Sequence, residues 1–241
     1  MPQCRILDLA RLPKAGKLKS IRFRRNTPGD HRPAVAGRDI REDDLYDPTH
    51  PATNVPRVLL HKSFPRYKNP FLQVEAVPKA MLARIDRQGS RPSPLNPPSV
   101  PTPEWSSVIT MSAPMIVEQL SANNGTVKRK VAWRIKTALN LIVTRGADVR
   151  TVRNVKGKEQ KLLVEGEPSR DLIRQDWTYV FVPALEVYRM PYEILIPMLR
   201  EALLLITARA HVLEKRWAAL APRPRLNAEN VRFLRLWRYP F

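Results

Sequence analysis

The residues best suited to bind another molecule lie together between Gly125 and Asn140. This segment contains one tryptophan, Trp133, and five cations, which are Lys128, Arg129, Lys130, Arg134 and Lys136. Lysine and arginine bind phosphate oxygens, and an indole ring stacks on an unpaired base. The segment therefore predicts a contact with a polyanion. For Trp133 there are two alternatives, packing against its own chain or against a neighbouring protein.

A helix is the element that would position these side chains. One apolar stripe follows helical spacing: Val127, Val131, Ile135, Ala138 and Ile142. The opposite face would carry Arg129, Trp133, Lys136 and Asn140, with Lys130 and Arg134 on its flank. Asn123-Asn124-Gly125 predicts the preceding turn, Thr126 the cap, and Gly146 the end of the helix. Such a helix has one face for a core and another for phosphates.

A second group mixes cations with aromatic residues at Arg66, Tyr67 and Lys68, between Phe64 and Phe71. A platform for a single nucleic-acid strand combines these two residue types. Packing of the two phenylalanines in a core or an interface explains the pattern equally well. We therefore treat Arg66, Tyr67 and Lys68 as further candidate RNA-binding residues.

The composition favours the same class of partner. The chain has 42 Lys and Arg against 22 Asp and Glu, a formal net charge of +20. Such an excess favours a polyanion, with nucleic acid first and an anionic membrane surface as the competitor. The sequence contains no apolar run of about 18 residues, so it predicts no membrane span.

The distribution of proline and charge suggests a domain organisation. Residues 1–54 are basic and predict a mostly irregular extension, whereas residues 55–206 predict an α+β RNA-binding core. Within that core, six prolines in 91–104 predict an extended strap, and the polar stretch 148–174 predicts a surface insertion with a strand at Lys161–Val164. Residues 207–241 predict a basic helical extension. The other expected strands cover 106–112 and 176–183, and Pro191 opens a long apolar helix.

The first 25 residues carry eight cations and one acid. An acid-poor, arginine-rich amino terminus is typical of a mitochondrial targeting segment. A basic arm that lies on RNA in the mature protein is the alternative. The only cysteine, Cys4, excludes an internal disulfide and fits a reducing compartment.

From Val108 to Ile206 the predicted order is strand, basic helix, strand and apolar helix, and it resembles the protein subunit of bacterial ribonuclease P. Lys128-Arg129-Lys130 stands in place of that family's Arg-Asn-Arg core, and residues 134–139 match its Arg-Leu-Arg-Glu-Ala-Phe. Residues 177–182 look like its next strand, and the helix from Pro191 like its last one. Arg129 replaces the family's asparagine, Ala132 and Trp133 replace two cations, and an insertion precedes the last strand. The resemblance spans about 100 of the 241 residues.

The resemblance implies a small mixed sheet with a basic and an apolar helix packed on it, as in the ribonuclease P protein and a related ribosomal-protein domain. It also implies a diverged, fungal-type mitochondrial form with long extensions, located in the matrix. Its partners would be ribonuclease P RNA and precursor tRNA. The protein would hold no cofactor, and Mg²⁺ would act through the RNA.

Two other functions remain open. One is a structural protein of the mitochondrial ribosome that binds rRNA and ribosomal proteins, and a weaker one is a mitochondrial translation or RNA-maturation factor. The four histidines lack zinc-ligand spacing, and Asp43 and Asp44 near Asp47 are more typical of a solvated turn than of a metal site. We therefore expect no catalytic centre in the protein itself.

Overall fold

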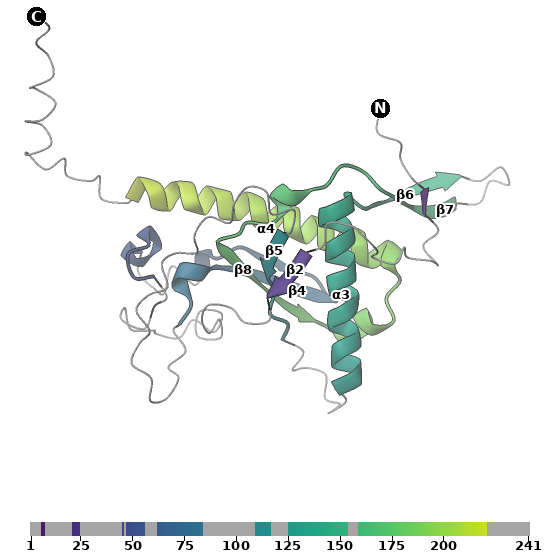
Figure 1. Ribbon diagram of the computed structural model, residues 1–241, viewed down its shortest axis with the longest axis horizontal. Coiled ribbons are helices and arrows are strands. Elements are labelled where there is room, and N and C mark those ends of the chain that lie inside the picture. Colours follow the sequence, from purple (N-terminus) through teal and green to yellow (C-terminus); the bar gives the residue numbers. More distant parts are fainter. Residues whose placement is uncertain are drawn as a thin grey trace, which may run out of the picture.

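The computed structural model describes residues 6–7, 21–24, 45, 47–55, 62–83, 109–116, 125–153 and 159–220 (Figure 1). These residues form a mixed α+β arrangement, with a five-stranded sheet, a three-stranded sheet and two long helices. The coarse fold class predicted from the sequence is thereby confirmed. The proline-rich strap 91–104 and residues 221–241 lie outside the described residues.

The five-stranded sheet has the order β2-β5-β8-β4-β3. Its strands are β2 (Ile21–Arg24), β5 (Ile109–Ser112), β8 (Trp177–Pro183), β4 (Leu72–Pro78) and β3 (Arg66–Lys68). The first three strands run parallel, whereas β8, β4 and β3 pair antiparallel. The predicted strand at 176–183 is confirmed as β8, in the centre. Apart from the half-buried Val182, its aromatic and β-branched residues are buried on both faces, as expected for a central strand.

Two helices cover one face of this sheet: α3 (Gly125–Arg145) and α4 (Tyr192–Leu220). Figure 1 shows α3, in teal, crossing α4, which extends past the sheet in yellow-green. Trp177, Tyr179 and Phe181 alternate along β8 and are buried. Trp177 stacks on Trp217 of α4, so this face of β8 turns toward the helices. The core lies between the sheet and the two helices.

Both helices begin close to where the sequence predicts, and α3 also ends there. α3 starts at Gly125, so Thr126 is its second residue and not its cap. It ends at Arg145, and the next residue, Gly146, has a φ of 57°, which glycine readily adopts. A Cβ at Gly146 would collide with the backbone of Glu167, so the chain also needs glycine here for close packing.

The polar insertion after α3 contributes two strands of a second sheet, which has the order β1-β7-β6. Its strands are β1 (Ile6–Leu7), β7 (Glu159–Val164) and β6 (Asp148–Arg153), paired antiparallel. The predicted strand at Lys161–Val164 is confirmed and begins two residues earlier. Leu163, Leu172 and Ile173 are buried, so part of the insertion belongs to the core.

The core extends beyond the predicted limits of 55 and 206. We expected residues 1–54 to form a mostly irregular extension outside the core, but β2 is an edge strand of the main sheet. Leu45 and Ala52 are also buried. Four residues are too few to show the alternation typical of a strand, and the surrounding cations suggested an irregular segment instead of β2. On the other side, α4 continues to Leu220 and buries Leu213 and Trp217, because apolar residues keep recurring at helical spacing.

Candidate nucleic-acid interface

The apolar stripe predicted for the basic helix is buried. Val131, Ile135, Ala138 and Ile142 are fully buried, and Val127 packs partly against the core. Trp133 lies on the other side of α3 and is 63% exposed. The predicted amphipathic orientation of the helix is therefore confirmed at these positions.

Charge and exposure are concentrated in the N-terminal half of α3. All five candidate cations lie between residues 128 and 136, whereas residues 137–144 carry no charge. In that second half Leu141, Ile142 and Val143 are all buried, although they point in different directions around the helix. The second half thus anchors α3, and the first half presents it to solvent.

Among the residues that the structure describes, no carboxylate pairs with the candidate cations of α3. The helix contains no Asp or Glu, and among the described residues none of the five forms an ion pair. Among the other described residues, four arginines form ion pairs, including Arg145 at the end of α3, which bonds Glu165 at 2.7 Å. Lys128 and Arg129 also lie near the N-terminus of α3, where the helix dipole is positive. Cations destabilise that end of a helix, so their charge adds to a positive potential directed outward.

Two of the five cations are held by aromatic rings. The Lys130 Nζ lies 4.6 Å from the centroid of the Tyr188 ring and 3.5 Å from its hydroxyl. The Arg134 guanidinium lies 4.6 Å from the centroid of Tyr192 and donates a hydrogen bond to the carbonyl of Met190. Burial raises the pKa of Tyr192, and the charge of Arg134 opposes that rise. Lys130 remains exposed, but Arg134 mainly fastens α3 to the start of α4.

One side of the expected outward face is covered by β2. The Lys136 Nζ lies 5.5 Å from the Phe23 ring centroid, and Asn140 Oδ1 accepts a hydrogen bond from the Ile21 amide at 3.3 Å. We expected Lys136 and Asn140 to face solvent, and both are half-buried. The difference arises because β2 was assigned to the extension. The surface that remains most open is formed by Arg129, Lys130 and Trp133.

The second candidate group, Arg66, Tyr67 and Lys68, lies on β3, far from this surface. α3 contacts β2, at the other edge of the five-stranded sheet. Four strand spacings separate the two edges, which is roughly 19 Å. Arg66 forms an ion pair with buried Glu75 at 2.9 Å, and the Tyr67 hydroxyl donates to Glu201 at 3.2 Å. The structure therefore does not bring the two groups together.

The two phenylalanines that flank β3 differ in exposure. Phe64 is buried, and Phe71 is 39% exposed. Burial raises the pKa of the Tyr67 hydroxyl; the hydrogen bond from Asn69 opposes this rise, while Glu201 adds to it. Lys68 is the one exposed member of the predicted triplet. The group has internal partners and provides no row of exposed aromatic rings.

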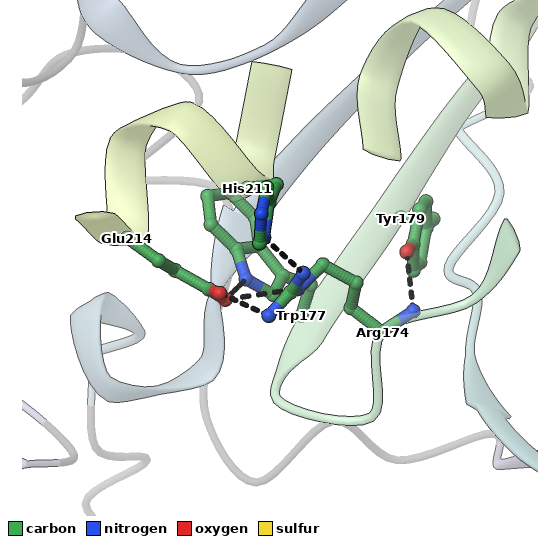
Figure 2. A network of polar contacts seen from close by, with 5 residues as sticks. All are labelled: Arg174, Trp177, Tyr179, His211 and Glu214. Carbon is green, nitrogen blue, oxygen red and sulfur yellow. Dashed lines mark hydrogen bonds and ion pairs between the residues drawn. The ribbon is translucent and has the colours of Figure 1, made fainter. Parts of the chain in front are cut away.

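A polar network under α4 was not predicted (Figure 2). Glu214 receives hydrogen bonds from Arg174 Nε at 3.0 Å and from Trp177 Nε1 at 2.6 Å. The Arg174 amide donates to the Tyr179 hydroxyl at 2.8 Å, and its guanidinium lies 3.4 Å from His211 Nδ1. These contacts lock α4 to the start of β8. Helical spacing alone could place Glu214 beside Trp217, but no local signal indicates its distant partners.

His50 completes this region from the amino-terminal side. Its ring lies edge-on to Trp217, with centroids 5.7 Å apart, and its Nδ1 accepts a hydrogen bond from the Ala52 amide. Burial lowers the pKa of His50, while Asp47, Glu214 and Asp176 oppose that change. The ring thus caps the short 3-10 helix η2 (Pro51–Asn54) and holds it on α4.

No group of three or more His, Cys, Asp or Glu side chains suited to a metal ion occurs in the part of the chain that the structure describes. Cys4, Asp43 and Asp44 lie outside that part. Its helices also include none with the length and apolar character needed to cross a membrane. No family model, no curated protein and no solved structure matches the chain.

Proposed function

We propose that this chain is a basic RNA-binding protein that grips structured RNA through the N-terminal half of α3. The observation that carries the proposal is the group of five cations within nine residues, without an ion pair among the described residues. Binding phosphates there would release counterions and relieve the repulsion between cations and the helix dipole. The net charge of +20 adds long-range attraction for the same ligand.

Within this proposal the protein is similar to the protein subunit of ribonuclease P. The order of β5, α3, β8 and α4 supports it, as does the burial of the apolar stripe of α3. The protein would hold RNA and a precursor-tRNA leader, while the RNA carries out cleavage with Mg²⁺. The proposed location is the mitochondrial matrix. Since Ile21 is buried, removal of a targeting segment would have to stop before β2.

The alternative is a structural protein of the mitochondrial ribosome. The observation in its favour is that β1 and β2, from one basic amino-terminal segment, join two different sheets. Ribosomal proteins use such long basic segments to follow rRNA. The two functions differ in the RNA that co-purifies with the protein: a small RNA with leader-cleaving activity, or a whole ribosomal subunit at high salt.

Charge reversal on α3 tests the RNA contact. In the variant Lys128→Glu/Arg129→Glu we expect RNA affinity to fall about 10- to 100-fold at moderate salt, with a shallower salt dependence. The thermal midpoint should stay the same or rise, because acids near a helix N-terminus are stabilising by about 0.3–1 kcal/mol each. Fluorescence anisotropy with a structured RNA and thermal unfolding measure the two effects.

The matched control is Lys215→Glu/Arg216→Glu, which changes net charge by the same amount at two exposed positions of α4. We expect this variant to retain most of the affinity, within about threefold, since the loss of long-range attraction is small beside lost contacts. Equal losses in both variants would show that net charge alone drives binding. An unchanged affinity in the α3 variant would contradict the proposal.

A further inference from the structure

The ring of Trp133 is unusually placed for a tryptophan. Of the tryptophans in described residues, Trp177 and Trp217 are 2% and 3% exposed, and they stack on each other with centroids 5.8 Å apart. Trp133 is 63% exposed and has no ring partner among the described residues. Exposure of so large an apolar ring to water is unfavourable, so a ligand that covers it gains free energy.

Three of the four neighbours of Trp133 on the helix surface are cations. Side chains three and four positions away lie beside it on an α-helix, and these are Arg129, Lys130, Lys136 and Thr137. Lys130 and Lys136 rest against the rings of Tyr188 and Phe23 on either side. None of the four neighbours is apolar. The indole ring is therefore a flat apolar surface inside a positively charged frame.

This combination favours one class of ligand. A protein partner would have to remove water from lysines around the tryptophan, whereas the centres of protein interfaces are poor in lysine. An unpaired nucleotide has a flat base for the ring and phosphates for the surrounding cations. A base inside a duplex has both of its faces stacked and presents none to the ring. Single-stranded RNA satisfies both features of the site.

We propose that Trp133 stacks on an unpaired base of the bound RNA, while the exposed Arg129 and Lys130 contact the adjoining phosphates and the half-buried Lys136 adds positive charge beside them. This inference rests on the proposed RNA contact of α3 and adds that the RNA is single-stranded there. A single-stranded loop or a leader of structured RNA provides such a base. The cations hold the backbone without regard to sequence, so the site accepts any base with a flat face.

The test compares Trp133→Phe with Trp133→Leu in the full chain. The ligands are an oligouridine of about 12 nucleotides and a blunt RNA duplex of the same length per strand. For Trp133→Leu we expect oligouridine affinity to fall about 5- to 100-fold, while Trp133→Phe stays within about threefold of wild type. Duplex affinity should change little in either variant. Because Trp133 is exposed, thermal unfolding should be unchanged in both variants, which ensures that only folded proteins are compared.

Tryptophan fluorescence supplies a second readout. Oligouridine should quench part of the wild-type emission, and this part should be missing in Trp133→Phe. An oligouridine affinity of Trp133→Leu equal to that of the wild type would overturn the inference. If both variants retain the wild-type affinity, an apolar protein contact at this site is favoured instead. If Trp133→Leu is neutral while Lys128→Glu/Arg129→Glu weakens binding, the proposed function stands and the stacking fails. If neither variant affects RNA binding, both proposals fail.

Discussion

The surface around Trp133 and the network around Trp177 contain similar residue types but differ in how their charges are paired. Each combines a tryptophan with cations and further aromatic rings. The network under α4 includes a carboxylate, Glu214, which satisfies both the indole N–H and the Arg174 guanidinium. No carboxylate pairs with the cations around Trp133 in the part of the chain that the structure describes.

The comparison shows that the same residue types, a tryptophan with cations, can either stabilise the fold or remain available to a ligand. Inside the network, opposite charges meet, and the field that reaches solvent is small. On α3, aromatic rings hold Lys130 and Arg134 without neutralising them. In the first arrangement, the charged groups bind one another within the protein. The second keeps positive charge for an external anion.

Removing Glu214 breaks the network and should have the largest effect on stability. In Glu214→Ala, Arg174 loses its ion pair and Trp177 its hydrogen-bond acceptor. The Arg174 and Glu214 side chains are 30% and 29% exposed, so water compensates in part. We expect the free energy of unfolding to fall by about 2 kcal/mol, measured by urea denaturation.

Glu159→Ala is the matched control for that measurement. Glu159 pairs with Arg153 at 3.7 Å, and their side chains are 64% and 80% exposed. Exposed pairs contribute little, so the change should stay below about 1 kcal/mol. Similar losses in the two variants would show that the network is no more important than a surface pair. RNA affinity should be unaffected by Glu214→Ala at temperatures where the variant is folded.

A smaller effect should appear in the pH dependence of stability, through His50. Burial lowers the pKa of the folded ring below its ordinary value of 6.5, so the unfolded chain binds this proton more tightly. The His50 contribution is therefore constant above about pH 7, and it declines as the pH falls toward the lowered pKa. Stability should decrease with falling pH across that window.

His50→Asn separates this effect from the titration of carboxylates. In the wild type, the Ala52 amide donates a hydrogen bond to His50 Nδ1. The side-chain oxygen of asparagine can accept the same hydrogen bond, but asparagine does not titrate. The free energy of unfolding should fall less steeply between about pH 7 and 5 in the variant than in the wild type. Parallel curves for the two proteins would show that the His50 ring titrates equally in both states.

The sequence predicted those parts of the fold that depend on local periodicity. The buried stripe of α3 and the strand at β8 follow directly from residue spacing. The short strand β2 escaped because its place depends on β5, which lies far along the chain. That omission also explains Lys136 and Asn140, which β2 covers.

In the candidate site, too, the sequence predicted the local features and missed the distant contacts. Exposure of Arg129 and Trp133 follows from their position opposite the apolar stripe. The inward role of Arg134 depends on Tyr192 and the Met190 carbonyl, which belong to the junction before α4. Likewise, Arg66 pairs with Glu75 through strand register, and a list of residue types contains no such information. Helix faces are local properties, whereas partners are set by topology.

The central claim is that the N-terminal half of α3 touches RNA, and cross-linking in cells tests it most directly. Ultraviolet cross-linking of the tagged protein, followed by mass spectrometry and sequencing, locates the linked residues and identifies the linked RNA. We expect nucleotide adducts on peptides that contain residues 128–136, with Trp133 among the modified positions. RNA recovered with adducts only on other elements, or a protein purified without any cross-linked RNA, would contradict the claim.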